Sequence, residues 1–295
     1  MDAILRDRRA ILVFVLPALL AYTLIVLGPV VWSLVYTVFS GNAISGFHYV
    51  GLKNIRELFH DPNFTAALKF TLKYAVVVTA GQIGFGLLLS LLYVFYLRRG
   101  STLIRTLVFF PVVIPTVAIA EMFAKLFAIV PQYGVVNAAF HAVGWSSQVK
   151  DWLGLSTGAF IVLVIMDIWR AMGFYAVLLY AGLINIPDEQ IESARLDGAS
   201  GVRLVRHIVI PALGPVLFSA LIFALTGTLR VFDSVLALTN GGPGQATTPL
   251  TLYMYNTAFT AGQYGYASAI ATSLAIICLL TTLLLFGFAR RDPTQ

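Results

Sequence analysis

Long, nearly uninterrupted runs of apolar residues dominate this chain, and polar residues gather between the runs. A helix needs about 20 apolar residues to cross the roughly 30 Å hydrocarbon core of a bilayer. Six runs reach that length, and they cover approximately residues 10–39, 67–97, 103–130, 159–184, 216–238 and 267–289. The first run is too long for the apolar core of a signal peptide, so we expect it to be retained. The pattern predicts an all-α membrane protein with six transmembrane helices.

The amino-acid composition also indicates that lipid surrounds most of the chain. Hydrophobic residues make up 59% of the 295 residues and charged residues only 11%, whereas soluble domains carry about 25% charged residues. The net charge of +6 comes from short basic clusters at the ends of the apolar runs, which suits anionic lipid headgroups better than nucleic acid. The single cysteine, Cys278, excludes a disulfide or a cysteine zinc site within the chain.

The distribution of basic residues predicts the orientation. Short loops rich in Lys and Arg remain in the cytoplasm. With six spans, one side of the membrane receives Arg6, Arg8, Arg9, Arg98, Arg99, Arg105, Arg195, Arg203, Arg206, Arg290 and Arg291. The opposite side receives Lys53, Arg56 and Lys150, with Lys69 and Lys73 at the entry to the second span. Both termini are therefore expected in the cytoplasm. We find no repeat and no long linker, so one membrane domain is expected over residues 1–295.

The segment 187–211 contains residues that typically start and end helices, and they predict two short helices. Pro187 suits a first helical turn, and Asp188 and Glu189 suit the positive end of a helix dipole. Gly198 suits the C′ position, where a left-handed conformation ends a helix. The residues predict a helix-turn-helix at the membrane surface, which either caps the bundle or binds a partner.

The second of these helices is expected over residues 200–210. Val202, Val205, Ile208 and Val209 fall on one side of it, and Arg203, Arg206 and His207 fall on another. Pro211 is expected to end it.

The same segment resembles the EAA loop of ABC importer permeases. That motif reads Glu-Ala-Ala, three residues, Gly, nine residues, then Ile-x-Leu-Pro, and here Ser193 replaces Ala and Ile210 replaces Leu. In that family the loop is a coupling helix, seated in a groove of a cytoplasmic ATP-binding subunit. The resemblance implies coupling residues at Glu189, Glu192, Ser193, Ala194, Asp197, Gly198, Ile208 and Pro211.

Three further stretches, at residues 49–74, 105–127 and 231–259, resemble the carbohydrate-uptake branch, of maltose and glycerol-phosphate type. Lys69 and Lys73 depart from that pattern. The resemblance implies the type I ABC importer fold in the bacterial plasma (inner) membrane and a carbohydrate substrate, expected to be a di- or oligosaccharide. Its implied partners are a second, different permease, two ATP-binding subunits that hold ATP and magnesium, and an extracytoplasmic solute-binding protein. Glycerol phosphate or another non-sugar solute remains an alternative substrate.

Ionisable residues within the predicted spans are candidates for a substrate pathway. They are costly in a bilayer unless paired or exposed to a wet cavity. The sets Glu121 with Lys125, Asp167 with Arg170, and Arg230 with Asp233 are three or four residues apart, so each set either forms a structural ion pair or faces a cavity. Sugars favour hydrogen-bonding groups beside aromatic rings. The predicted pathway is Asp167, Trp169, Arg170, Tyr175, Thr226, Arg230, Asp233, Asn256, Thr272 and Ser273.

Other chemistries find little support in the sequence. The glycine-rich stretch at residues 240–248 has no Lys of the Walker A type and is expected outside the cytoplasm. The four histidines are scattered without metal-binding spacing, and no nucleophile elbow is present. We therefore expect no catalytic residue, no metal and no cofactor in this chain.

Two other classes of protein remain as alternatives. In an ion-coupled secondary transporter, the intramembrane carboxylates Asp167 and Asp233 would be the carriers. An integral-membrane enzyme would need a convergent catalytic set at the interface, and the sequence offers none.

Overall fold

The computed structural model describes residues 8–42, 44, 46–97 and 101–289. It contains two compact units, each built from two segments of the chain. The first unit combines residues 1–65 with 253–276, and the second combines residues 66–252 with 277–295. Of the basic residues used for orientation, Arg6, Arg98, Arg99, Arg290 and Arg291 lie outside the described residues.

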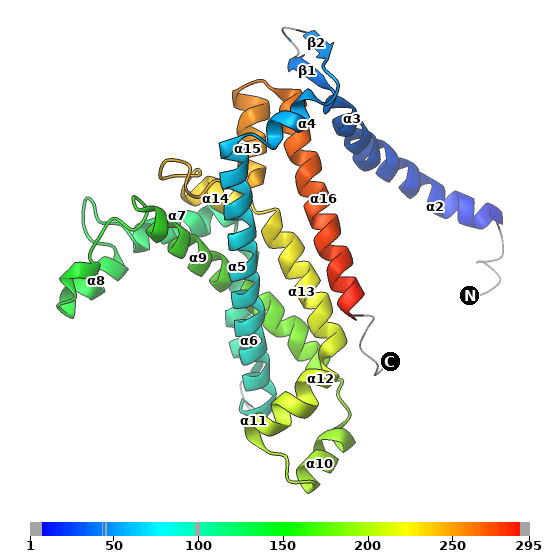
Figure 1. Ribbon diagram of the computed structural model, residues 1–295. Coiled ribbons are helices and arrows are strands. Elements are labelled where there is room, and N and C mark those ends of the chain that lie inside the picture. The colour runs from blue at the N-terminus through cyan, green and yellow to red at the C-terminus, as the bar shows by residue number, and fades with distance from the viewer. Residues whose placement is uncertain (1–7, 43, 45, 98–100, 290–295) are drawn as a thin grey trace. The chain divides into compact units, whose positions relative to one another are not determined.

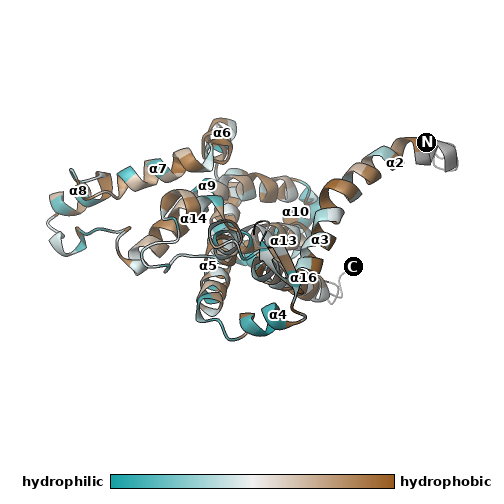
Figure 2. Ribbon diagram, turned by 90° about the horizontal axis from the view of Figure 1, so that it is seen from above, coloured by the Kyte–Doolittle hydropathy of each residue, from teal (hydrophilic) through white to brown (hydrophobic). Residues whose placement is uncertain are grey.

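The first unit begins with one long apolar helix. Its parts are α2 (Arg8–Tyr22), the π-helical turn η1 (Thr23–Leu27) and α3 (Gly28–Tyr36). The wide turn η1 ends two residues before Pro29, whose ring would clash with a carbonyl one turn back in a regular helix. No residue of the span Val13–Tyr36 is buried within the chain, and Figure 2 shows α2 and α3 largely in the hydrophobic colour. Such a helix suits an apolar surrounding.

The predicted first run, 10–39, extends too far at its end. The helix ends at Tyr36, and an antiparallel hairpin follows, formed by β1 (Phe39–Asn42) and β2 (Gly46–Tyr49), which the all-helical prediction did not include. The short polar helix α4 (Lys53–Leu58) comes next and stands out as hydrophilic in Figure 2. Its buried Asn54 donates hydrogen bonds of 2.8 Å to the carbonyls of Thr37 and Phe39, which fixes the hairpin entrance.

The C-terminal part of the first unit is held by Asp61. This part contains the end of α15 (Leu250–Tyr255), the π-helical turn η5 (Asn256–Thr260) and the start of α16 (Tyr264–Ala289). The hydroxyls of Tyr253 and Tyr266 donate to Asp61 Oδ2 at 2.5 and 2.6 Å, and the backbone N–H of Asn63 donates to Oδ1 at 2.8 Å. Burial alone would raise the pKa of Asp61, but the hydrogen bonds outweigh burial and hold the pKa below its ordinary value.

The second unit contains the remaining helices. They are α5 (Pro62–Phe95), α6 (Ser101–Phe109), the 3₁₀ turn η2 (Phe110–Val113), α7 (Thr116–Leu126), α8 (Val135–Ala142), η3 (Ser146–Gln148), α9 (Ser156–Leu183), α10 (Asp188–Leu196), α11 (Gly201–Leu204), the π-helical turn η4 (Val205–Val209), α12 (Ile210–Ala212), α13 (Gly214–Leu229) and α14 (Asp233–Leu238). In Figure 1, α10, α11 and α12 lie at the lower end of α13, and α14 lies beyond its upper end.

Two of the six predicted runs are not single helices. Of the helices in the described residues, four are long and apolar enough to cross a membrane, and two bent pairs also qualify if each pair is one span. In the run 103–130, the chain bends by 99° because Ile114 is extended before Pro115. In the run 216–238, the helix ends at Leu229, and a new one begins at Asp233. The second bent pair combines residues 201–212 with 214–229, at 74°.

Two hydrophobic clusters organise the second unit. The first joins α5, α7, α9 and α14 through buried side chains that include Val78, Ile119, Met166 and Val235. The second joins α9, α10, α11 and α13 through Leu183, Ala194, Leu204 and Ala220, among others. The first cluster therefore surrounds the breaks in the third and fifth runs, and the second anchors the segment 187–211.

The close approach at Gly265 yields a test of the first unit. A methyl group at Gly265, in the first turn of α16, would overlap the carbonyl oxygen of Phe39 and lie 3.0 Å from Asn54 Nδ2. We expect Gly265→Ala to lower the free energy of unfolding by about 1–3 kcal/mol through overpacking. The melting temperature of the detergent-solubilised protein, followed by fluorescence-detected size exclusion, checks this.

The control is Gly287→Ala near the other end of α16, where an added Cβ meets nothing within 4 Å. We expect this variant to melt at or slightly above the temperature of the unmodified protein, because alanine favours a helix. Equal melting temperatures for the two variants would contradict the assigned packing of Gly265.

Candidate functional site

A polar cavity of about 250 Å³ lies in the second unit. It forms where α5, α9, α13 and α14 meet the first residue of α7. Its lining residues are Gln82, Thr116, Asp167, Arg170, Ala171, Tyr175, Ala224, Gly227, Thr228, Arg230, Val231, Phe232, Asp233 and Ser234. Charges of both signs and several hydroxyl groups therefore face one space within an otherwise apolar unit.

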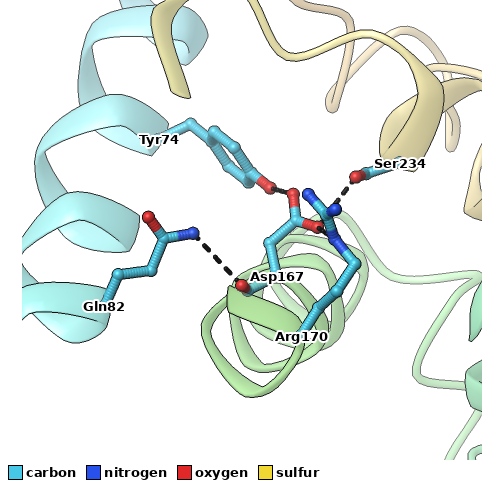
Figure 3. A network of polar contacts seen from close by, with 5 residues as sticks. All are labelled: Tyr74, Gln82, Asp167, Arg170 and Ser234. Carbon is cyan, nitrogen blue, oxygen red and sulfur yellow. Dashed lines mark hydrogen bonds and ion pairs between the residues drawn. The ribbon is translucent and has the colours of Figure 1, made fainter. Parts of the chain in front are cut away.

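The carboxylate of Asp167 is at the centre of the polar network beside this cavity (Figure 3). Its Oδ1 accepts hydrogen bonds from Ser234 Oγ at 2.8 Å and from Arg170 Nε at 3.2 Å. Its Oδ2 accepts a hydrogen bond from the hydroxyl of Tyr74. The backbone carbonyl of Asp167 also accepts a bond from Gln82 Nε2 at 3.1 Å. Asp167 is only 3% exposed, and a buried polar side chain requires hydrogen-bond partners within the protein.

The sets Glu121 with Lys125 and Arg230 with Asp233 do not form ion pairs in the part of the chain that the structure describes. Among the described residues, Asp167 and Arg170 form the only ion pair within 4.0 Å. Glu121 and Lys125 are both exposed on α7, so neither charge requires a partner to offset the cost of burial. Arg230 Nε instead donates to the carbonyl of Thr226 at 3.0 Å. Of the three sets for which the sequence allowed either ion pairing or a cavity-facing position, the structure shows an ion pair for one.

Arg230 and Asp233 owe their placement to the break between α13 and α14. Arg230 is the C-cap of α13, and Asp233 is in the first turn of α14. A cation at a helix C-terminus and an anion at an N-terminus are both stabilised by the helix dipole. Both side chains are exposed and line the cavity. The break thus brings one hydrogen-bond donor group and one acceptor group to the cavity wall.

The structure brings only part of the predicted pathway together. Asp167, Arg170, Tyr175, Arg230 and Asp233 line the cavity.

Trp169 and Thr226 do not line it. The ring of Trp169 packs on Phe123, with ring centroids 5.8 Å apart. The hydroxyl of Thr226 donates to the carbonyl of Ile222 in its own helix.

The last three predicted pathway residues, Asn256, Thr272 and Ser273, belong to the first unit. The hydroxyls of Thr272 and Ser273 bond to carbonyls of their own helix, α16.

Sequence reasoning missed the contribution of α5 and of Ser234. Thr71, Tyr74, Thr79 and Gln82 are all buried, although they are polar residues in an apolar run. Their spacing places them on one side of a helix, a stripe that signals an inward-facing polar surface in a membrane span. Thr79 shares a 2.9 Å hydrogen bond with Thr228 of α13. Ser234 had no such signal, because its burial depends on the helix break.

The segment 187–211 is the second candidate feature. The backbone N–H of Ala199 donates to the carbonyl of Ala194 at 2.8 Å, and that of Gly198 donates to the carbonyl of Arg195 at 3.0 Å. These two bonds form a Schellman motif with Gly198 at C′, where its φ is +84°. The predicted role of Gly198 as the helix end is confirmed. Pro187 lies one residue before α10 rather than within its first turn.

One face of α10 is anchored and the other is free. Ala194 is 7% exposed and belongs to the second hydrophobic cluster. The predicted coupling residues Glu189, Glu192, Ser193, Asp197 and Gly198 are exposed. Leu196, 90% exposed, adds an apolar side chain to this surface.

The helix after this turn differs from the prediction in two respects. Val202 is 82% exposed, whereas Ile208 is half-buried and Val209 is fully buried. Pro211 is exposed and does not end the helix, which continues to Ala212. The π-helical turn η4 ends two residues before Pro211 and accommodates the missing N–H and the bulk of its ring.

The sequence is similar to those of known permease proteins. A permease protein of Bacillus subtilis, YurN, described as a probable ABC transporter permease, is 37% identical, with 96% of each chain covered. The multiple sugar-binding transport system permease protein MsmF of Streptococcus mutans is 33% identical and covers 83% of this chain and 82% of its own length.

A solved structure has the same fold. A chain of a bacterial ABC transporter involved in the import of the acidic polysaccharide alginate has a TM-score of 0.81 at 21% identity, covering 96% of this chain and 95% of its own. At that identity the likeness concerns the fold alone. The predicted fold class, an ABC importer permease, is confirmed.

A family match covers most of the chain. Residues 82–291 match the family described as binding-protein-dependent transport system inner membrane component. That range includes α9, α13 and α14 of the cavity and the whole segment 187–211. The chain therefore belongs to the family of inner membrane components of binding-protein-dependent transport systems.

Proposed function

We propose that this chain is a transmembrane permease subunit of an ATP-driven importer that carries a carbohydrate, delivered by an extracytoplasmic binding protein, across the bacterial plasma membrane. The observation that carries the proposal is the polar cavity inside a member of this transport family. The relative MsmF, named as a permease for multiple sugars, supports a carbohydrate substrate.

The chemistry of the cavity suits a sugar. Each sugar hydroxyl both donates and accepts hydrogen bonds, so it benefits from a wall that offers donors and acceptors together. Arg230 offers donors, Asp233 offers acceptors, and Tyr175 adds an aromatic ring. A purely apolar solute would leave these groups without partners, at a cost in binding free energy.

An ion-coupled secondary transporter fits the cavity less well. A proton carrier requires a carboxylate that alternates between charged and neutral forms. Asp167 is instead 3% exposed, and its two oxygens already accept hydrogen bonds from Arg170 and from the hydroxyls of Tyr74 and Ser234, so little of the carboxylate is accessible for exchange with solvent. Only Asp233 remains exposed in the cavity for such a role.

The proposed assembly contains this chain, a second and different permease, two ATP-binding subunits and the binding protein. Hydrolysis of ATP, with magnesium, takes place in the ATP-binding subunits. Both termini of this chain and the segment 187–211 face the cytoplasm, as the alternation of basic residues indicates.

The coupling surface consists of Glu189, Glu192, Ser193, Asp197 and Gly198, with Ala194 anchoring it. Its mixture of carboxylates and an exposed leucine, Leu196, suits a groove in an ATP-binding subunit. Ile208, in the following helix, packs against the same hydrophobic cluster as Ala194, and Pro211 lies exposed three residues later.

A pull-down tests the assembly. We expect the tagged chain, purified in mild detergent from its native host, to bring with it a Walker A-containing ATPase and a second permease. Mass spectrometry identifies both, and the co-encoded binding protein identifies the sugar. A chain that purifies alone, or only with itself, would contradict the heteromeric importer.

A substitution at the helix end tests the coupling surface. We expect Gly198→Asp to leave the protein in the membrane but to abolish uptake, because a non-glycine residue costs roughly 1–2 kcal/mol at this positive φ and the new charge lies on the partner-facing surface. Uptake of the sugar that the binding protein binds, and the ATPase retained in the pull-down, are measured together. Gly214→Ala, at an open position without a positive φ, is the control. Normal uptake with Gly198→Asp would count against the coupling role.

A pair of substitutions tests the cavity. We expect Arg230→Ala and Asp233→Asn each to lower uptake by about tenfold or more, because each removes a charged hydrogen-bonding group from the pathway. The ATPase should remain bound in both variants, since neither residue lies on the coupling surface. Glu121→Gln, a charge removal at an exposed position that does not line the cavity, should leave uptake unchanged. Wild-type uptake in both cavity variants would place the substrate elsewhere.

A further inference from the structure

The side chain of Asp167 is occupied by protein donors. Three groups donate to its two oxygens, and they come from three helices: Tyr74 of α5, Arg170 of α9 and Ser234 of α14. A carboxylate has about four acceptor positions. With three of them used and only 3% of the residue exposed, Asp167 offers a passing sugar little to bind.

The hydroxyl of Ser234 links α14 to α9 through its hydrogen bond to Asp167. Ser234 is 3% exposed and lies one residue after Asp233, the cavity residue that opens α14. The break at residues 230–232 interrupts the helical hydrogen bonds between α13 and α14, so α14 does not have to follow α13. Its position depends instead on its packing in the first hydrophobic cluster and on this hydrogen bond.

The helix that carries Asp167 also leads to the coupling surface. From Asp167 to Leu183, α9 continues without a break for sixteen residues, or about 24 Å at 1.5 Å per residue. Leu183 and Ile186 pack in the second hydrophobic cluster with Ala194 of α10. A displacement of α10 is therefore passed to α9 by packed side chains and along α9 by its regular backbone.

We propose that Asp167 is a positioning residue that links α14 to α9, so that movement of α10 driven by nucleotide shifts α14 and with it the cavity wall at Asp233. This inference rests on the proposed function, because it requires an ATP-binding partner at α10. It gives Asp167 a role distinct from that of Arg230 and Asp233: Asp167 moves the wall, and the other two residues contact the substrate.

The experiment reads out movement of α14 without any knowledge of the sugar. The complete transporter, purified with its partners, carries Cys278→Ser, which removes the single native cysteine. One version adds Leu236→Cys on α14, at a side chain 38% exposed, and a second version adds Gln190→Cys on the exposed part of α10. The rate of modification by N-ethylmaleimide is measured without nucleotide and with ATP plus vanadate.

We expect nucleotide to change the modification rate at both positions in the otherwise unmodified transporter, by about fivefold at Leu236→Cys. Adding Ser234→Ala, which removes only the hydroxyl that binds Asp167, should abolish the change at Leu236→Cys and keep it at Gln190→Cys. Ser234→Thr retains a hydroxyl and should restore the change. Ser219→Ala removes a hydroxyl that bonds only within its own helix, and the change should persist.

The remaining outcomes contradict either the positioning role or the proposed function. A nucleotide response at Leu236→Cys that survives Ser234→Ala would overturn the positioning role, as would a response at Gln190→Cys with none at Leu236→Cys in the parent transporter. Loss of the response at both positions with Ser234→Ala would also overturn it, because it would make Ser234 a general structural requirement. Failure of the parent transporter to bind an ATPase would instead overturn the proposed function itself.

Discussion

A charged group inside an apolar helical unit has to find its partners within the chain, and the carboxylate of Asp167 meets this requirement through α5, α9 and α14 at once. Tyr74, Arg170 and Ser234 each contribute one donor. Since an unsatisfied buried charge costs several kcal/mol, the three helices are held in the one arrangement that satisfies it. The shape of the cavity beside Asp167 depends on that arrangement.

The breaks in the third and fifth runs give the cavity its polar wall. A regular membrane helix satisfies every backbone group internally and offers only side chains to a solute. Where α13 ends at Leu229 and α14 begins at Asp233, helix ends and charged side chains become available together. The bend before α7 brings Ile119 and Phe123 into the same hydrophobic cluster as Val235 of α14. Packing between α7 and α14 thus covers the interruption on its apolar side.

The coupling surface is held by local backbone hydrogen bonds together with apolar packing, and not by a buried carboxylate. Local hydrogen bonds at Gly198 shape the turn after α10, while Ala194 and Leu204 fix the segment onto α9 and α13. The anchored face is apolar and buried, and the free face carries Glu189, Glu192 and Asp197. A segment that is packed against neighbouring helices passes a displacement by a bound partner on to those helices better than a flexible loop would.

The sequence by itself determined the features that arise from local or compositional causes: the membrane class, the six apolar runs, the helix end at Gly198 and the resemblance of the segment 187–211. Only the tertiary structure decided which polar residues meet, because the partners of Asp167 lie 93 and 67 residues away in the chain, at Tyr74 and Ser234. It also decided that Trp169 packs on Phe123 instead of lining the cavity, and that the fifth run breaks after Leu229. The physical reason is that hydropathy describes the preference of each residue for water or an apolar surrounding. The hydrogen-bond partners of a buried carboxylate are instead residues distant in the chain, which only folding brings close.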